Sequence, residues 1–384
     1  MIGFLVRKKR VSEQRNKIKG SRRWVVKIGS ALLTNNGCGL KHELLDNWVK
    51  QIVELNKRGI EIVIVSSGAV AEGVARLGWK SRPIAIHELQ AAAAVGQMGL
   101  IQAYEVCFQK YDKHTAQILL THDDIADRAR YLNARTSLNT LLKLGVAPIV
   151  NENDSVATDE IRLGDNDTLA ALVANLVDAE LLVLLTDQDG LYTADPRTDT
   201  SAKLIQQAEA NDQSLRAYAG EGGSLGRGGM RTKLKAAAIA AKSGTQTVIA
   251  FGNDDSILLN IADGKEIGTL LTTSEEPVQA RKRWLANQAH LQGSVTLDDG
   301  AVTALTKNGK SLLPVGIRSV DGDFKRGEII SCTDKSGNEI ARGLSNYDSV
   351  QVKLIIGKST VEIKQCLGQI DEDELIHRDN MILI

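Results

Sequence analysis

Between residues 23 and 275, short apolar runs alternate with longer segments in which apolar residues recur at helical spacing. Trp24–Ile28 is apolar apart from Lys27 and Ile62–Val65 is apolar throughout, and Leu44–Val53 between them repeats at the three- and four-residue spacing of a helix. The strand pattern recurs at Gln117–Leu120, Val146–Val150, Leu181–Leu185 and Thr247–Ala250. Apolar strands separated by helices predict an α/β fold, with an open, mainly parallel sheet sandwiched by helices over residues 23–275.

The pattern changes beyond residue 275. Segment 276–292 is charged and is expected to be a linker. From residue 293 onward, short apolar runs such as Glu339–Leu344 are separated by turn sequences, among them Asp298-Asp299-Gly300 and Lys335-Ser336-Gly337. This spacing predicts a small, mostly β domain over residues 293–384.

Basic residues are concentrated at the N-terminal end. Residues 1–23 contain nine Lys or Arg and one Glu, in a chain of 384 residues whose 47 basic and 47 acidic side chains cancel. The apolar segment Met1–Val6 precedes its basic cluster, which is the reverse of a secretory signal. Residues 1–22 are therefore expected to be a solvated basic arm, or a stretch upstream of the true start codon. An RNA or membrane contact is the alternative.

Apolar run length and cysteine spacing indicate the cellular location. No apolar run approaches the roughly 18 residues that span a bilayer, so no membrane partner is expected for the chain beyond the basic arm. The four cysteines are far apart and form no CxxC pair, which favours a reducing, cytoplasmic location.

Small and polar residues follow the first two predicted strands. Lys27-Ile28-Gly29-Ser30 ends the first strand, and Ser66–Val70 opens a helix after the second. Ligands of parallel sheets bind beyond the carboxyl ends of the strands, and a helix N-terminus attracts anions. An ordinary strand exit and a serine N-cap are the structural alternatives.

Two dense polar clusters, Asn151–Asp154 and Gly164–Asp167, are expected at the same edge of the sheet. Their carboxylates and amides suit an ammonium group, whereas the serine segment suits a carboxylate. Together they predict a site for a zwitterion. A helix N-cap is the alternative role for the second cluster.

Two later segments suit a nucleotide. Thr186–Arg197 is a long polar segment after the fifth predicted strand, for which a surface loop is the alternative. Gly226–Lys233 places glycines, a threonine and a lysine at the start of an alanine-rich helix, a composition typical of a phosphate cradle. It is not a Walker motif, and the Gly-Lys-Ser tripeptides at 309–311 and 357–359 lack the first P-loop glycine.

Taken in order, these motifs resemble those of the glutamate 5-kinases of the amino acid kinase family, in the long bacterial form with a C-terminal PUA domain. The segments that carry the resemblance are Val25–Ser30, Val65–Val70, Tyr131–Arg135, Ile149–Thr158, Gly164–Asp167, Leu184–Arg197 and Gly228–Lys233. The resemblance covers residues from about 23 to 384. It implies an amino acid kinase fold followed by a PUA-like domain, and it leaves the basic arm outside the family pattern.

The resemblance also implies roles for individual residues. Lys27 and Lys233 would contact the transferred phosphoryl group, and Asp167 would orient both lysines. The residues implied to hold the substrate glutamate are Ser67, Asn151, Asp154 and Asn166. The residues implied to bind ATP are Lys27, Thr186, Asp187, Arg227, Gly228, Gly229, Met230, Arg231, Thr232 and Lys233. Arg227 and Arg231 depart from the family pattern, because many relatives carry small hydroxyl residues there.

The implied reaction is the ATP-dependent phosphorylation of the side-chain carboxylate of L-glutamate, the first step of proline biosynthesis. Mg²⁺ would arrive on ATP without protein ligands, and proline would act as a feedback inhibitor. The residues agree with this chemistry, because a carboxylate with a reference pKa of about 4.3 is already ionised at pH 7 and needs no general base. The product is a labile acyl phosphate, which predicts hand-off to glutamate-5-semialdehyde dehydrogenase. The family also implies a homo-oligomer, a dimer or a tetramer.

Two other interpretations stay open. The same fold could serve an acetylglutamate, aspartate or carbamate kinase. The chain could instead bind RNA through the PUA-like domain, but residues 276–384 contain 14 Lys or Arg and 15 Asp or Glu. RNA-binding surfaces depend on a positive field, so the charge balance disfavours that role.

Overall fold

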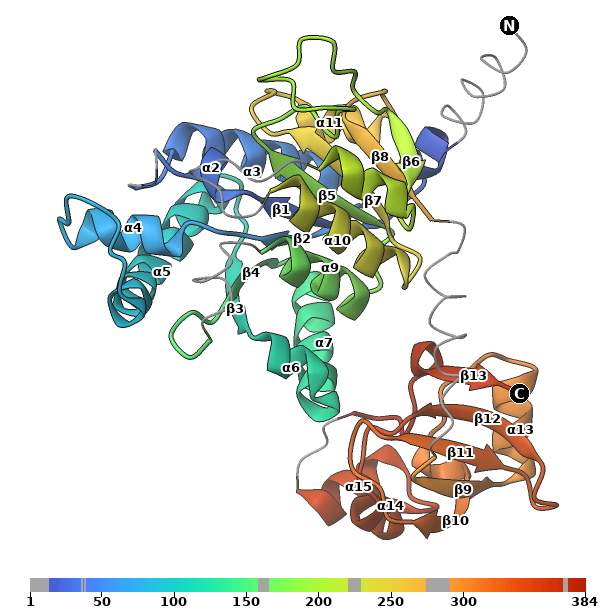
Figure 1. Ribbon diagram of the computed structural model, residues 1–384. Coiled ribbons are helices and arrows are strands. Elements are labelled where there is room, and N and C mark those ends of the chain that lie inside the picture. Colours follow the sequence, from blue (N-terminus) through green and yellow to red (C-terminus); the bar gives the residue numbers. More distant parts are fainter. Residues whose placement is uncertain are drawn as a thin grey trace, which may run out of the picture. The chain divides into compact units, whose positions relative to one another are not determined.

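The computed structural model describes residues 14–35, 37, 39–157, 166–219, 229–273, 291–368 and 372–384. Its contacts divide the chain into two units, shown in Figure 1: Met1–His122 with Arg135–Pro277, and Asp123–Ala134 with Val278–Ile384. The expected linker over 276–292 lies outside the described residues except for its last two positions. None of the helices in the described ranges is long and apolar enough to cross a membrane.

An eight-stranded sheet organises the first unit, with the strand order β3-β4-β2-β1-β5-β7-β8-β6. Its strands are β1 (Arg23–Ile28), β2 (Glu61–Val65), β3 (Thr115–Leu120), β4 (Ala147–Glu152), β5 (Leu181–Thr186), β6 (Gln207–Glu209), β7 (Gln246–Phe251) and β8 (Thr269–Thr272). Neighbouring strands are parallel except for the antiparallel pair β7–β8. The predicted mainly parallel sheet is confirmed.

Helices cover both faces of this sheet (Figure 1). The helices between residues 30 and 262 are α2 (Ser30–Leu33), α3 (His42–Lys57), α4 (Ala69–Arg76), α5 (Ile86–Gln109), α6 (His122–Ala126), α7 (Arg128–Lys143), α9 (Asp167–Leu176), α10 (Met230–Ala241) and α11 (Ile257–Ala262), with a 3₁₀ turn at Gln213–Tyr218. Nearly all of α6 and the first part of α7 belong to the second unit. The main core joins Trp24, Val26 and Ile28 of β1 to residues of α3, α5 and α11. Because side chains alternate along a strand, Val25 and Lys27 face the other side, where α9 packs on β1.

Residues 14–22 are part of the first unit. Residues 14–19 are helical, and Arg15 is only 1% exposed, while Ile18 joins the main core. The Arg15 guanidinium donates hydrogen bonds to the backbone carbonyls of Gln206, Lys265, Ile267 and Gly268. The expectation of a solvated arm is therefore wrong for residues 14–22, because a buried apolar side chain and a guanidinium with many donors anchor them. Residues 1–13 lie outside the described ranges.

The second unit is built on a five-stranded sheet with the order β10-β9-β11-β12-β13. Its strands are β9 (Gly293–Leu297), β10 (Ile317–Gly322), β11 (Ile329–Thr333), β12 (Glu339–Leu344) and β13 (Met381–Leu383), and its helices are α13 (Asp299–Thr306), α14 (Ser349–Ile355) and α15 (Thr360–Leu367), with 3₁₀ turns at Pro314–Gly316 and Arg378–Asn380. The β11–β9 pair is parallel and the other pairs are antiparallel.

One predicted turn of the second unit is wrong. Asp298-Asp299-Gly300 begins helix α13, and the Asp298 side chain accepts a hydrogen bond from the Ala301 amide at 2.7 Å. An aspartate followed by small residues serves equally well in a turn and as a helix N-cap, so composition alone did not separate the two structures.

Candidate active site

The sheet order places a topological switch point at β1. From β1 the strand order continues to β2, β4 and β3 on one side and to β5, β7, β8 and β6 on the other. Ligands of open α/β sheets bind outside the carboxyl ends of the strands, where the direction of the strand order reverses. The polar segments predicted from the sequence follow β1, β2, β4 and β5, so they lie around this point.

Two lysines share one buried carboxylate at this edge. Lys27 Nζ lies 2.6 Å from Asp167 Oδ1, and Lys233 Nζ lies 3.0 Å from Asp167 Oδ2. Asp167 is fully buried, and the two lysines are 5% and 7% exposed. The three groups together carry a net charge of +1. Burying a net charge costs free energy, so an anionic ligand that neutralises it is favoured.

Two helix N-termini bring these charges together. Asn166 is the N-cap of α9 and Asp167 is its first residue, while Lys233 lies in the first turn of α10. Thr232 Oγ1 lies 2.9 Å from Asp167 Oδ2 and so links the two helix starts. The positive ends of the helix dipoles stabilise Asp167 and also suit phosphate oxygens.

A chain of side-chain amides lies next to the charged cluster. Asn166 Nδ2 donates to the Ser66 carbonyl at 2.7 Å and to Asn151 Oδ1 at 2.8 Å, and it lies 3.3 Å from Ser67 Oγ. Asn151 Nδ2 donates in turn to Gln97 Oε1 at 2.8 Å. The structure therefore joins the serine segment to both polar clusters that the sequence analysis selected.

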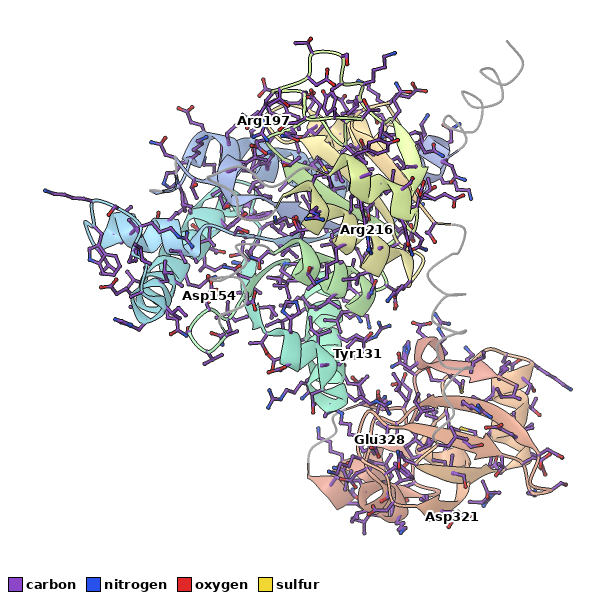
Figure 2. All side chains as sticks on the ribbon, viewed as in Figure 1. Tyr131, Asp154, Arg197, Arg216, Asp321 and Glu328 are labelled. Carbon is purple, nitrogen blue, oxygen red and sulfur yellow. The ribbon has the colours of Figure 1, made fainter. Side chains whose placement is uncertain are left out.

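The acidic residues of the first polar cluster are also buried. Asp154 follows the end of β4 and is 5% exposed (Figure 2). Glu152 is 1% exposed, and its carboxylate lies 3.6 Å from His122 Nδ1 without a hydrogen bond. These carboxylates give the edge of the site a negative charge, which suits an ammonium group.

Two residues of α5 belong to the site although the sequence analysis missed them. Gln97 binds Asn151, and the Tyr104 hydroxyl lies 3.0 Å from Ser66 Oγ. Burial raises the pKa of Tyr104 well above its ordinary value, so the phenol stays neutral. The sequence did contain one indication of this role. Gln97 is a polar residue at helical spacing from Leu100 and Tyr104, on the buried face of α5.

Glycines bring α5 close to the serine segment. A Cβ on Gly96 would lie 1.9 Å from the Ala69 carbonyl oxygen, and one on Gly73 would lie 1.7 Å from that of Ala92. Helix α4 itself starts after Gly68, whose φ of 98° is in the left-handed region that favours glycine. The backbones of α4 and α5 are therefore in direct contact beside Gln97.

The residues expected to bind a nucleotide surround the ends of β5 and α10. Thr186 is 7% exposed at the end of β5, and its hydroxyl lies 3.1 Å from Asp187 Oδ1. Gly229 is the N-cap of α10, followed by a half-buried Met230 and an exposed Arg231. Arg227 and Gly228 lie outside the described residues. Within the described ranges, no group of three or more His, Cys, Asp or Glu side chains could hold a metal ion.

Comparison with known proteins assigns the family. The amino acid kinase family model matches residues 22–251, and the PUA domain model matches residues 293–367. Glutamate 5-kinase of Nitrosospira multiformis is 59% identical over 96% of this chain and 99% of its own, and that of Pseudomonas syringae pv. tomato is 58% identical over 96% and 100%. The structure of UMP kinase from Bacillus anthracis aligns with 66% of this chain and 97% of its own, at 17% identity and a TM-score of 0.46. The chain belongs to the amino acid kinase family and, within it, to the glutamate 5-kinases.

Proposed function

We propose that this chain transfers the γ-phosphoryl group of ATP to the side-chain carboxylate of L-glutamate, producing L-glutamyl 5-phosphate. Relatives named glutamate 5-kinase match it at 59% and 58% identity over nearly their whole length. The observation that carries the proposal is the buried Lys27–Asp167–Lys233 cluster beside a network of amides. The cluster suits a phosphoryl group, and the network suits an amino acid.

The reaction requires positioning and charge neutralisation. The glutamate carboxylate is ionised at pH 7, since its reference pKa is about 4.3, and it attacks the phosphorus without a general base. Lys27 and Lys233 stabilise the charge on the equatorial oxygens of the phosphoryl group, and Asp167 holds both ammonium groups in place. Mg²⁺ arriving with ATP would supply further charge neutralisation.

The two substrates occupy different sides of this cluster. Ser67, Asn151, Asp154 and Asn166 hold glutamate, and the negative charge of Asp154 suits its ammonium group. The nucleotide side comprises Thr186, Asp187 and residues 227–233, which include the N-terminus of α10.

The instability of the product bears on the pathway in which the chain acts. An acyl phosphate hydrolyses readily, so hand-off to glutamate-5-semialdehyde dehydrogenase in proline biosynthesis protects it. We further propose a cytoplasmic homo-oligomer, a dimer or a tetramer, that proline inhibits at a site overlapping the glutamate pocket.

Trapping the acyl phosphate with hydroxylamine tests this function. The purified chain is incubated with ATP and Mg²⁺ and, in separate reactions, with glutamate, N-acetylglutamate or aspartate, each with and without proline. We expect hydroxamate from glutamate alone and less of it when proline is present. Hydroxamate from another substrate instead would change the substrate assignment. No hydroxamate from any of them would contradict the proposed reaction class.

A further inference from the structure

Two buried polar atoms of the amide network have no hydrogen-bond partner among the described residues. They are Gln97 Nε2, a donor, and Asn166 Oδ1, an acceptor. Gln97 is 9% exposed and Asn166 is fully buried, so solvent reaches neither side chain freely. Buried polar groups are almost always paired in folded proteins, and an unmatched donor and acceptor in one network indicate a polar ligand.

The orientation of each amide is fixed by the one before it. The Ser66 carbonyl can only accept a hydrogen bond, so the Asn166 group facing it is the NH₂ group. The same Nδ2 atom donates to Asn151, whose oxygen must therefore face Asn166 and whose NH₂ group must face Gln97. Gln97 consequently accepts with its oxygen, and its NH₂ group is left for another partner.

Gln97 lies at the end of this network that is farther from the phosphoryl-binding cluster. The order of contacts runs from Gln97 through Asn151 to Asn166, and Asn166 is followed directly by Asp167, which binds Lys27 and Lys233. The contact of Gly96 with Ala69 fixes the backbone of α5 here, so Gln97 cannot move away without separating two packed helices.

We propose that Gln97 determines substrate specificity by donating a hydrogen bond from Nε2 to the α-carboxylate of the amino-acid substrate. This inference rests on the proposed function. The γ-carboxylate must reach the two lysines, so the carboxylate at the other end of glutamate meets the opposite end of the amide network. An NH₂ group cannot accept a hydrogen bond from an ammonium group, whereas the Asn166 oxygen can. The unmatched donor and acceptor thus complement the two charges of a zwitterion.

Two substitutions separate this role from a merely structural one. Gln97→Glu keeps an oxygen that accepts from Asn151 but replaces the NH₂ donor with a negative charge. Gln97→Met removes both functions while keeping a similar length. Gln102→Glu and Gln102→Met are the matched controls, because Gln102 is an exposed glutamine of the same helix that accepts from Arg76.

Hydroxamate formation gives the KM for glutamate, the KM for ATP and kcat of each variant. We expect Gln97→Met to raise the glutamate KM about tenfold or more, the usual cost of losing a hydrogen bond to a charged group. We expect Gln97→Glu to raise it further, because the new carboxylate repels the α-carboxylate. The KM for ATP should stay within about threefold, and the Gln102 variants should match the unmodified chain.

A substrate analogue provides a measurement that general damage to the fold does not mimic. L-Isoglutamine keeps the reacting γ-carboxylate but carries an amide in place of the α-carboxylate. The ratio of kcat/KM for glutamate to kcat/KM for isoglutamine should fall in Gln97→Met by about tenfold, because only glutamate loses the charged hydrogen bond. A variant that simply misfolds lowers both values and leaves their ratio unchanged.

The outcomes distinguish this inference from the proposed function. A nearly unaltered Gln97→Glu beside an impaired Gln97→Met would mean that Gln97 only orients Asn151, and it would overturn the inference. An unchanged glutamate-to-isoglutamine ratio would overturn it as well. Absence of glutamyl hydroxamate from the unmodified chain would overturn the proposed function first and the role of Gln97 with it.

Discussion

The ammonium group of Lys27 lies 2.6 Å from Oδ1 of Asp167, a carboxylate with no solvent exposure. Lys27 occupies a position in a central strand where both neighbouring residues are buried and apolar. An unpaired charge there would be strongly destabilising, so Asp167 is required for the lysine to remain charged and fixed. Lys233 uses the second oxygen of the same carboxylate, which sets the spacing of two positive charges.

The first prediction concerns the two lysines. Lys27→Ala and Lys233→Ala should each lower kcat by about 100-fold or more, because their charges act mainly on the transition state. The glutamate KM should change far less, within about threefold. Steady-state kinetics by hydroxamate formation provides the measurement, with Lys235→Ala on the exposed side of α10 as the control. A large rise in KM at unchanged kcat would contradict these assignments.

Asp167→Asn tests the carboxylate with almost no change in shape. Two nearly buried ammonium groups would lose their shared negative partner, which should lower the free energy of unfolding by about 3 kcal/mol. The kcat should fall as well, since neither lysine is held in place. Urea unfolding and steady-state kinetics check the two effects. A variant of unchanged stability and activity would show that the lysines do not depend on Asp167.

The convergence of Lys27, Ser67, Asn151 and Asp167 could be anticipated from the sequence. Lys27, Ser67 and Asn151 lie at or just after the carboxyl ends of predicted strands, which meet at one edge of a parallel sheet, and Asp167 belongs to a polar cluster that opens a predicted helix. The place of Gln97 could not be anticipated in this way. It lies 54 positions before Asn151, within a helix, and its position depends on backbone contacts made by Gly73 and Gly96. Periodicity gives the buried face of a helix but not the element that this face meets.

Gly96→Ala should disturb both stability and substrate binding. Its Cβ would lie 1.9 Å from the Ala69 carbonyl oxygen, so α4 and α5 must separate. Overpacking of this kind costs about 1–3 kcal/mol or more, and the shift should also raise the glutamate KM by displacing Gln97. Thermal unfolding and kinetics measure the two effects, with Ala94→Ser on the exposed side of α5 as the control. Wild-type behaviour would mean that the two helices are not in direct backbone contact.

Cysteine reactivity follows from burial. Burial raises the pKa of Cys107 to about 11 and that of Cys332 to about 12, whereas Cys366 is exposed. A raised pKa favours the neutral thiol, so at pH 8 only about one Cys107 in a thousand is a thiolate, the reactive form. Iodoacetamide at pH 8, followed by peptide mass spectrometry, should modify Cys366 before the other two cysteines that the structure describes, Cys107 and Cys332. Equal rates at Cys107 and Cys366 in the folded protein would contradict this order.

Arg15 should matter for stability but not for catalysis. Its guanidinium donates to four backbone carbonyls that precede β6 and β8, and burial lowers its pKa to about 10, so it is still charged at pH 7. Arg15→Ala removes all four hydrogen bonds, although the Gln206 and Lys265 carbonyls keep a backbone donor, and it should lower the free energy of unfolding by about 2–4 kcal/mol. Arg15→Lys should be intermediate, because a single ammonium group cannot reproduce the planar fork of donors.

Urea unfolding measures these losses, with Lys17→Ala on the exposed side of the same helix as the control. The kcat and the glutamate KM of the folded Arg15 variants should equal those of the unmodified chain, since the Arg15 guanidinium binds the backbone before β6 and β8 and not the described residues that we propose to bind either substrate. An Arg15→Ala variant as stable as the Lys17 control would show that residues 14–19 do not anchor to the sheet. Loss of activity at full stability would instead connect this helix to the site itself.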